Sequence, residues 1–429
     1  MSIVKLSVCM IVKNEESNIA TALNSVKDIA FEMIVVDTGS TDKTVEIAKN
    51  MGAIVHHFEW INDFAAARNA SIEYATSDWV LTLDADEYLL PDDAQRLMHI
   101  LEEMQPEPER FKDCLAVSFM LVNIDDNGRQ MTKSSNLRVF RNIPSIRFAG
   151  RIHEQLTVEK KNIVHTNNVT LMHTGYSESV HKKTGKSKRN IELLRAEIKK
   201  DPNNITLKAY LANSLSMSTI DADQEEAETL FKEILNSGKS SRINDTLIIK
   251  LYIYLINKYI SDPDKLPESE QICKKALQTY PHSVDFEYLN AVIKHKKEEH
   301  EKAWELLKNC EENLINDPTP ENALMIPADP TILFCQMILT AKAIGDIENV
   351  ILYSTHVLTM DKTRKSILGP CIATLLYYGV TEAETIDLLS NIYDMHDPKD
   401  LNIVAQAAKE YGATAFAERI STNILRSNY

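Results

Sequence analysis

The chain has 429 residues, of which 44% are hydrophobic and 25% are charged, a composition typical of a globular protein with two or three domains. Its formal net charge of -15 argues against a nucleic-acid partner, because phosphate backbones require a basic face. No apolar run reaches the length of a membrane span, the segment KLSVCMIVKN lacks signal-peptide features, and the six cysteines have no C-x-x-C spacing, so we expect a reduced, cytoplasmic protein.

Apolar segments alternate with helix-length segments from the N-terminus to the acidic stretch DADE. The strand-like segments are KLSVCMIV, EMIVVD, AIVHHFEW and DWVLTLDAD, separated by the helix-like NEESNIATALNSVKD, STDKTVEIAKNMG and DFAAARNASIEYA. This alternation predicts right-handed βαβ units and a mostly parallel, Rossmann-like α/β sheet. The shorter β-like stretches LAVSFMLVNID, NLRVFRN, RFAGRIHEQLTV and VTLMHTGY follow, and we interpret them as the completion of a mixed sheet.

Polar residues follow these strands at their carboxyl ends, where open α/β sheets bind ligands. Asn14 and Glu15 follow the first strand, Asp37 closes the second, and Asp84 and Asp86 close the fourth. In an extended chain Asp84 and Asp86 emerge on the same side, which predicts a bound Mg²⁺ or Mn²⁺, although a solvated turn tolerates the same acids. Asp37 is a candidate acceptor for the imide N–H of a uracil. No G-x-G-x-x-G or Walker pattern occurs in this half, so phosphate must be held by a metal.

The pattern becomes helical after the basic run HKKTGKSKR. The amphipathic segments RNIELLRAEIKKDPNN, EEAETLFKEILNSG, ESEQICKKALQTYPHS and HEKAWELLKNCEENLINDP recur at roughly 40 residues, the spacing of tetratricopeptide-type repeats. We predict an α/β domain over residues 1–182 and an all-α domain over residues 183–429. The helical domain either binds a protein or peptide on a concave face or stabilises and dimerises the first domain. The basic segment 182–189 is either a solvated linker or a loop that binds diphosphate or an acidic leader peptide.

The segments VCMIVKNEE, VVDTGSTD, WINDFAAARN and DADE together resemble the family 2 glycosyltransferases, inverting enzymes of GT-A fold that use nucleotide-sugar donors. The residues that this resemblance places at the nucleotide sugar are Asn14, Glu15, Asp37, Arg68 and Asp84. It also implies that Asp84 and Asp86 are a metal-binding D-x-D pair. Asp86 is then the direct ligand, while Asp84 lies beside the ribose or a metal-bound water.

A second resemblance covers most of the chain and is to the bacteriocin S-glycosyltransferases of the sublancin and thurandacin type. It is carried by WINDFAAARNASIEYATSDW, FAGRIHEQL, HTGY and KSKRNIELL. It implies a GT-A domain joined to helical repeats, and transfer of a hexose, expected to be glucose, from a UDP-sugar to a Cys or sometimes a Ser of a ribosomally made peptide. The alternatives are a cell-envelope saccharide acceptor, such as a lipopolysaccharide core, and a nucleotide-sugar-binding scaffold without turnover. A homodimer is expected of exposed helical repeats.

Inverting transfer also needs a base for the acceptor proton. The segment GRIHEQ offers His153 and Glu154, which lie on opposite faces if the segment is extended. Carboxylate bases are usual in the enzymes that this chain resembles, so Glu154 is preferred, and His153 is either the alternative base or a neighbouring hydrogen-bonding residue. The resemblance further implies that His173, in LMHTGY, completes the metal shell.

Overall fold

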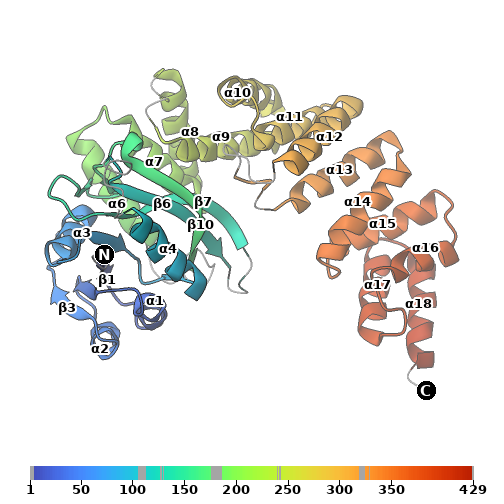
Figure 1. Cartoon of the computed structure of the whole chain (residues 1–429). Coiled ribbons are helices and arrows are strands. Elements are labelled where there is room, and N and C mark those ends of the chain that lie inside the picture. Colours follow the sequence, from blue (N-terminus) through green and yellow to red (C-terminus); the bar gives the residue numbers. More distant parts are fainter. Residues whose placement is uncertain are drawn as a thin grey trace. The chain divides into compact units, whose positions relative to one another are not determined.

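The computed structural model describes residues 4–104, 113–125, 128, 130–174, 186–238, 240, 243–317, 324–327 and 329–427 (Figure 1). The chain forms two compact units, Met1–Ile243 and Asn244–Tyr429. The domain boundary predicted after residue 182 lies outside the described residues. The unit that contains the sheet continues through three further helices to Ile243.

Within the described residues, the first unit contains an eight-stranded mixed sheet of order β3-β2-β1-β4-β7-β6-β10-β5. Its parallel part consists of β1 (Leu6–Val12), β2 (Glu32–Asp37), β3 (Ile54–His57) and β4 (Trp79–Thr82). The remaining strands are β5 (Glu87–Leu89), β6 (Ala116–Ile124), β7 (Gln130–Arg141) and β10 (Ile163–His173). Strand β7 is antiparallel to both β4 and β6, whereas β10 is parallel to β6. The predicted parallel sheet with a mixed completion is therefore confirmed.

Helices cover both faces of this sheet. They are α1 (Ile19–Val26), α2 (Thr44–Asn50), α3 (Phe64–Glu73) and α4 (Pro91–Glu103), and a short ribbon of β8 (Phe148–Ala149) and β9 (Gln155–Leu156) lies beside α3. Alternate residues of β1 point to opposite faces. Val8 and Met10 join one core with Leu23 of α1, while Cys9 joins another with Ile72 of α3. Because both faces are buried, the strands are continuous apolar runs rather than alternating ones.

The rest of the described chain is helical. The first unit adds α6 (Lys186–Lys200), α7 (Ile205–Ser216) and α8 (Asp221–Asn236). The second contains α9 (Asp245–Ile260), α10 (Leu266–Thr279), α11 (Val284–Lys296), α12 (His300–Asn316), α13 (Thr331–Ile344), α14 (Ile347–Met360), α15 (Lys365–Tyr377), α16 (Glu382–Ser390), α17 (Pro398–Glu410) and α18 (Thr414–Ser427). Most of these helices pack on their neighbours in sequence, as in stacked helix pairs, although α17 packs on α15 and α18. The predicted class, a GT-A-type α/β domain followed by an all-α helical domain, is confirmed.

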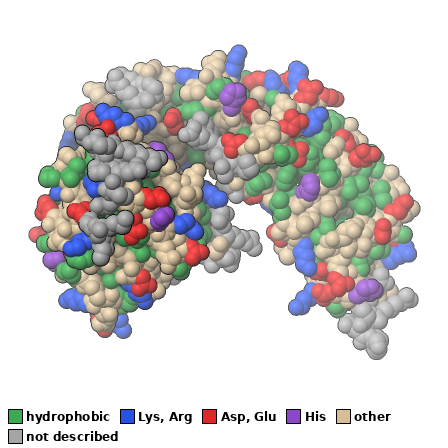
Figure 2. Space-filling view, viewed as in Figure 1, with side chains coloured by type: hydrophobic (Ala, Val, Ile, Leu, Met, Phe, Trp, Pro, Cys, Tyr) green, Lys and Arg blue, Asp and Glu red, His purple; other side chains and the backbone are tan. Residues whose placement is uncertain are grey.

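Acidic and basic side chains are interspersed over the coloured part of the surface in Figure 2. All six cysteines lie in described segments, and each is a free thiol. Among the described helices, none combines the length and the apolar character that crossing a membrane requires.

Candidate active site

The carboxyl end of β2 holds Asp37 in a fixed orientation. The residue is 6% exposed, and its carboxylate accepts the backbone N–H groups of Gly39 and Ser40 at 3.2 and 3.0 Å. Gly39 has a φ of 105°, a left-handed value that glycine adopts without strain, so the chain turns sharply back around the carboxylate. The Nδ1 atom of His57 lies 3.4 Å from Asp37 Oδ2. Asp37 therefore ends its strand as an oriented hydrogen-bond acceptor.

The loop after β1 is joined to the loop after β2 by side-chain bonds. Asn14 has a φ of 56°, which Asn tolerates better than most residues, and its Oδ1 accepts the Thr41 N–H at 2.7 Å. The Glu15 N–H donates to Thr44 Oγ1 at 2.7 Å. Since β1 and β2 are parallel neighbours, the predicted nucleoside residues Asn14, Glu15 and Asp37 lie at adjacent strand ends.

The acidic segment is a turn. Strand β4 ends at Thr82, and the Glu87 N–H donates to the Asp84 carbonyl at 3.0 Å. In the sheet β4 and β5 are separated by β7, β6 and β10, so the segment must leave the strand direction to reach β5. The extended conformation that would place Asp84 and Asp86 on one side is therefore not found, and the two carboxylates have different partners.

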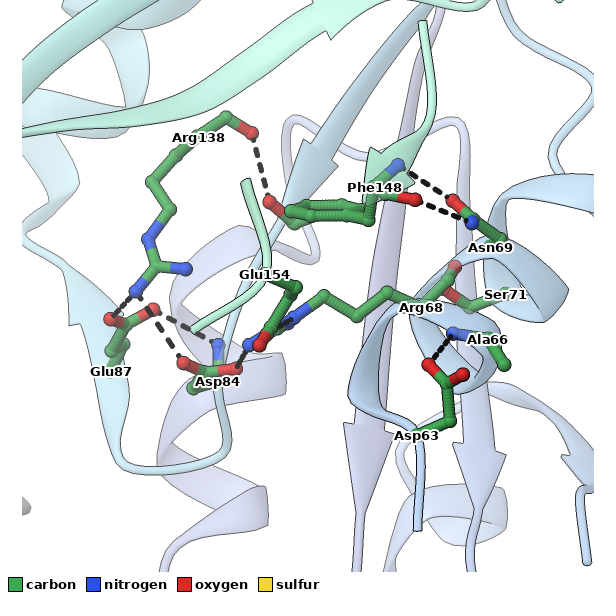
Figure 3. Close-up of polar contacts among 11 residues, drawn as sticks. Asp63, Ala66, Arg68, Asn69, Ser71, Asp84, Glu87, Arg138, Phe148 and Glu154 are labelled. Atoms are coloured by element: carbon green, nitrogen blue, oxygen red, sulfur yellow. Dashed lines mark hydrogen bonds and ion pairs between the residues drawn. The ribbon is translucent and has the colours of Figure 1, made fainter. Parts of the chain in front are cut away.

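Asp84 belongs to a chain of ion pairs shown in Figure 3. Arg68 of α3 donates from Nε to Glu154 Oε1 at 2.6 Å and from Nη2 to Asp84 Oδ1 at 2.9 Å. Arg138 of β7 approaches from the other side and pairs with both Asp84 Oδ2, at 3.4 Å, and Glu87. Glu87 is only 1% exposed, and buried charges of this kind persist only when they are paired.

Burial has different outcomes for Asp84 and Glu87, the two acids that pair with Arg138. Burial opposes ionisation of Asp84, but the positive charges of Arg68 and Arg138 outweigh it and lower the pKa of this carboxyl. Burial of Glu87 raises its pKa despite the attraction of Arg138. Asp84 is consequently a carboxylate at neutral pH, and it is ion-paired with both arginines.

Asp86 faces His173, the last residue of β10. His173 Nε2 lies 3.5 Å from Asp86 Oδ2, and His173 Nδ1 lies 2.6 Å from Asn123 Oδ1. The Asn123 oxygen can only accept, so Nδ1 carries the proton and the Nε2 lone pair of a neutral ring faces the carboxylate. Two acceptors in this position require a proton or a cation between them. In the protein without a cation, burial opposes protonation, but the hydrogen bond and charge of Asp86 raise the pKa of His173.

The donors at this position fit a hard divalent cation. Within the described segments, no group of three or more His, Cys, Asp or Glu side chains is arranged to hold a metal. Asp86 and His173 are the two side chains here that could hold such an ion. This number suits Mg²⁺ or Mn²⁺, which keep several coordination positions for substrate phosphates and water.

The segment that carries His153 and Glu154 is also not extended. His153 has a φ of 53°, and its ring stacks on Tyr210 of α7 with a centroid distance of 3.8 Å and an interplanar angle of 10°. Burial lowers the pKa of His153 to about 4, so the ring is neutral and a weak base at pH 7. The side chain of Glu154 reaches Arg68. This geometry favours Glu154 over His153 as the base.

Four residues that the sequence analysis did not select contribute to this region: Arg138, Glu87, Asn123 and Tyr210. The sequence contained one indication of Arg138, since this charged residue lies within the β-like run NLRVFRN. Glu87 was visible as the last acid of DADE. Asn123 and Tyr210 come from distant segments, and nothing in their local sequence distinguishes them.

Comparison with known proteins identifies the first part of the chain. Residues 7–149 match the model of Glycosyl transferase family 2. A TPR repeat-containing protein of Synechococcus elongatus is 34% identical over 245 residues, which cover 55% of this chain and 57% of that protein. The SPbeta prophage-derived glycosyltransferase SunS of Bacillus subtilis is 30% identical over 298 residues, covering 66% of this chain and 65% of SunS.

A further relative matches over a shorter length. An uncharacterized glycosyltransferase of Rickettsia typhi is 48% identical over 85 residues, or 20% of this chain and 29% of that protein. The matches to the Synechococcus protein and to SunS each span less than two thirds of the relative. Residues 7–149 form a family 2 glycosyltransferase domain.

Proposed function

We propose that the protein is a metal-dependent inverting glycosyltransferase that transfers a hexose, expected to be glucose, from a UDP-sugar to the Cys or Ser side chain of a ribosomally made bacteriocin peptide. The observation that carries the proposal is the pairing of Asp86 with His173 beside the buried chain formed by Arg68, Asp84 and Glu154. The match to SunS, a glycosyltransferase, supports the transfer activity; its 298 aligned residues outnumber those up to the end of β10, so it includes part of the helical region. The peptide acceptor rests on the resemblance of FAGRIHEQL, HTGY and KSKRNIELL to the bacteriocin S-glycosyltransferases.

The nucleoside is assigned to the ends of β1 and β2. The oriented carboxylate of Asp37 suits the imide N–H of uracil, since an ionised acceptor forms a stronger hydrogen bond than a neutral one. Asn14 and Glu15 line the same edge. Arg68 acts indirectly, because its Nε and Nη2 atoms are bonded to Glu154 and Asp84 and hold these carboxylates in place.

Asp86 and His173 are assigned to Mg²⁺ or Mn²⁺. When bound, the ion neutralises the negative charge that develops on the leaving diphosphate. Asn123 contributes by accepting from Nδ1, which fixes the ring so that Nε2 points toward Asp86. His173 must be neutral to act as a ligand, so cation binding releases its proton.

Glu154 is assigned the role of base. The acceptor sulfur or oxygen forms a bond to the anomeric carbon, the bond from this carbon to the diphosphate oxygen breaks, UDP leaves, and the acceptor proton passes to Glu154. Arg68 holds Oε1 of this carboxylate and thereby orients the other oxygen. A thiol, whose pKa is about 8.5, needs less assistance than a hydroxyl, so Glu154 matters more for Ser than for Cys.

The test uses the purified full-length chain with Mn²⁺, Mg²⁺ or EDTA, a panel of UDP-sugars, and synthetic peptides that contain a single Cys, Ser or Ala at one position. We expect the intact mass of the Cys peptide to increase by one hexose, the Ala peptide to remain unmodified, and EDTA to abolish the reaction. Release of UDP without a mass gain on any peptide would instead favour a cell-envelope saccharide acceptor. Unchanged turnover in EDTA would contradict the metal assignment.

A further inference from the structure

The segment 150–156, which carries Glu154, is held from two sides. On one side the segment contacts α3, because the Arg151 carbonyl accepts the Phe64 N–H at 2.9 Å and Arg151 Nε lies 3.5 Å from Asp63, the N-cap of α3. On the other side, Arg151 Nε lies 3.8 Å from Glu197 of α6. The segment therefore lies between the glycosyltransferase domain and the helices that follow it.

Tyr210 of α7 contacts the residues on both sides of Glu154. Its ring stacks on His153, and its side chain is hydrogen-bonded to that of Gln155. Burial, and to a lesser extent the charge of Glu154, raise the pKa of Tyr210. A single helical side chain thus holds the residues immediately before and after Glu154.

The backbone at His153 needs such support. Its φ of 53° lies in the left-handed region, which is unfavourable for residues that have a β-carbon. Conformations of this kind persist only where the surroundings impose them. The Nε2 atom of the ring is buried and has no hydrogen-bond partner among the described residues, so the stack on Tyr210 is the contact that orients this ring. The left-handed turn in turn directs the next residue, Glu154, toward Arg68.

We propose that Tyr210 is a positioning residue for Glu154, and that α6 and α7 are part of the transfer site in addition to any role in acceptor binding. This inference rests on the proposed role of Glu154 as the base. Arg68 fixes the carboxylate from the α3 side, and Tyr210 fixes the backbone that presents it from the α7 side.

The test compares Tyr210→Ala and Tyr210→Phe in the full-length chain, with UDP release from UDP-glucose and Mn²⁺ as the assay. Tyr210→Ala removes the stack and should lower kcat about 10- to 100-fold, as expected when a catalytic group is misplaced, while the KM for UDP-glucose stays nearly constant. Tyr210→Phe keeps the stack and should retain most of the activity. Tyr74→Ala is the matched control, because Tyr74 stacks on His56 at 3.5 Å in the same unit and away from Glu154.

A double-mutant cycle separates positioning from a general structural effect. If Tyr210 acts through Glu154, adding Tyr210→Ala to Glu154→Gln should have little further effect on kcat. An additive loss would overturn the inference. If Glu154→Gln itself leaves turnover unchanged, the proposed base is wrong. If Glu154→Gln is impaired but Tyr210→Ala is fully active, only the positioning role fails.

A second measurement does not depend on turnover. Amide hydrogen exchange of residues 150–156, followed by mass spectrometry, should be faster in Tyr210→Ala than in the unmodified chain and unchanged in Tyr210→Phe and Tyr74→Ala. Equal exchange in all four proteins would show that the stack does not hold the segment, and would reject the inference even for a chain that turns over UDP-glucose slowly.

Discussion

Asp84 and Asp86 are two residues apart, yet their electrostatic settings are opposite. Asp84 lies between two guanidinium groups, which lower its pKa although burial opposes ionisation. Asp86 faces an imidazole whose lone pair points toward it. The first carboxylate therefore neutralises the arginines, and the second is the one suited to a cation.

Substitutions around this pair test the metal assignment. Removing Asn123, which orients His173, should weaken Mn²⁺ binding by the roughly 10- to 100-fold typical of outer-shell partners. Asp86→Ala removes a ligand and should weaken it further. Isothermal titration with Mn²⁺ and UDP measures both. Glu159→Gln, at an exposed carboxylate, is the control, and equal affinity in Asp86→Ala would remove this residue from the site.

The same pair predicts a pH dependence. Burial opposes protonation, but Asp86 raises the pKa of His173 above its ordinary value of about 6.5. In the metal-free protein, the contribution of the Asp86–His173 ion pair to the free energy of unfolding is therefore fully present below about pH 6.5. It is lost as the pH rises through the pKa of His173 in the folded state. Mn²⁺ needs the neutral ring, so its affinity should increase over the same interval. Titrations at several pH values should show this slope, and His173→Gln should flatten it.

Arg138 predicts a large effect on stability. Arg138→Leu leaves Glu87, which is 1% exposed, without its guanidinium partner, and the loss of one member of a buried pair costs about 3–5 kcal/mol. Urea unfolding measures this loss. The double variant Arg138→Leu, Glu87→Gln should recover part of it, whereas Lys161→Leu, at an exposed ion pair, should leave the unfolding midpoint unchanged. A midpoint in Arg138→Leu equal to that of the unmodified chain would contradict the buried-pair interpretation.

At the scale of elements, hydrophobic patterning located the strands and helices of the parallel part of the sheet. It did not predict the conformation of the acidic segment DADE. Strand β2 covers the predicted EMIVVD, and α3 falls within DFAAARNASIEYA. The turn before β5 depends on pairing with β10, which is distant in sequence, so no local pattern could reveal it. Asp37 followed from its position at a strand end, whereas His173 followed from its position together with the family resemblance. Arg138 and Tyr210 act through long-range contacts, which explains why they were missed.

The N-terminus of α3 links an element to the site. Asp63 accepts the Ala66 N–H at 2.9 Å and also approaches Arg151. Asp63→Ala should cost about 1 kcal/mol of stability through loss of the cap, and it should reduce turnover because α3 carries Arg68. Asp63→Asn keeps a capping oxygen and should restore most of the stability. Thr381→Ala, which removes a cap in the second unit, should leave turnover intact.

At the scale of the whole molecule, the compact unit that contains the sheet includes α6, α7 and α8. The family match ends at residue 149, just before the segment that carries Glu154. The contacts of Glu197 and Tyr210 with this segment give a physical reason why the glycosyltransferase domain and the first helices form one unit.

Two truncated chains test where the functional unit ends. Residues 1–243 keep the contacts of α6 and α7 with the segment 150–156, so this chain should bind UDP and Mn²⁺ and release UDP from UDP-glucose at close to the full-length rate. Residues 1–182 keep the sheet but lose Tyr210 and Glu197, so turnover should fall about 10-fold or more even where UDP binding survives. Circular dichroism checks that both chains fold.

If the peptide docks on the helices that follow Ile243, residues 1–243 should also lose peptide glycosylation while retaining UDP release. Equal turnover by the two truncated chains would place the first helices outside the transfer site.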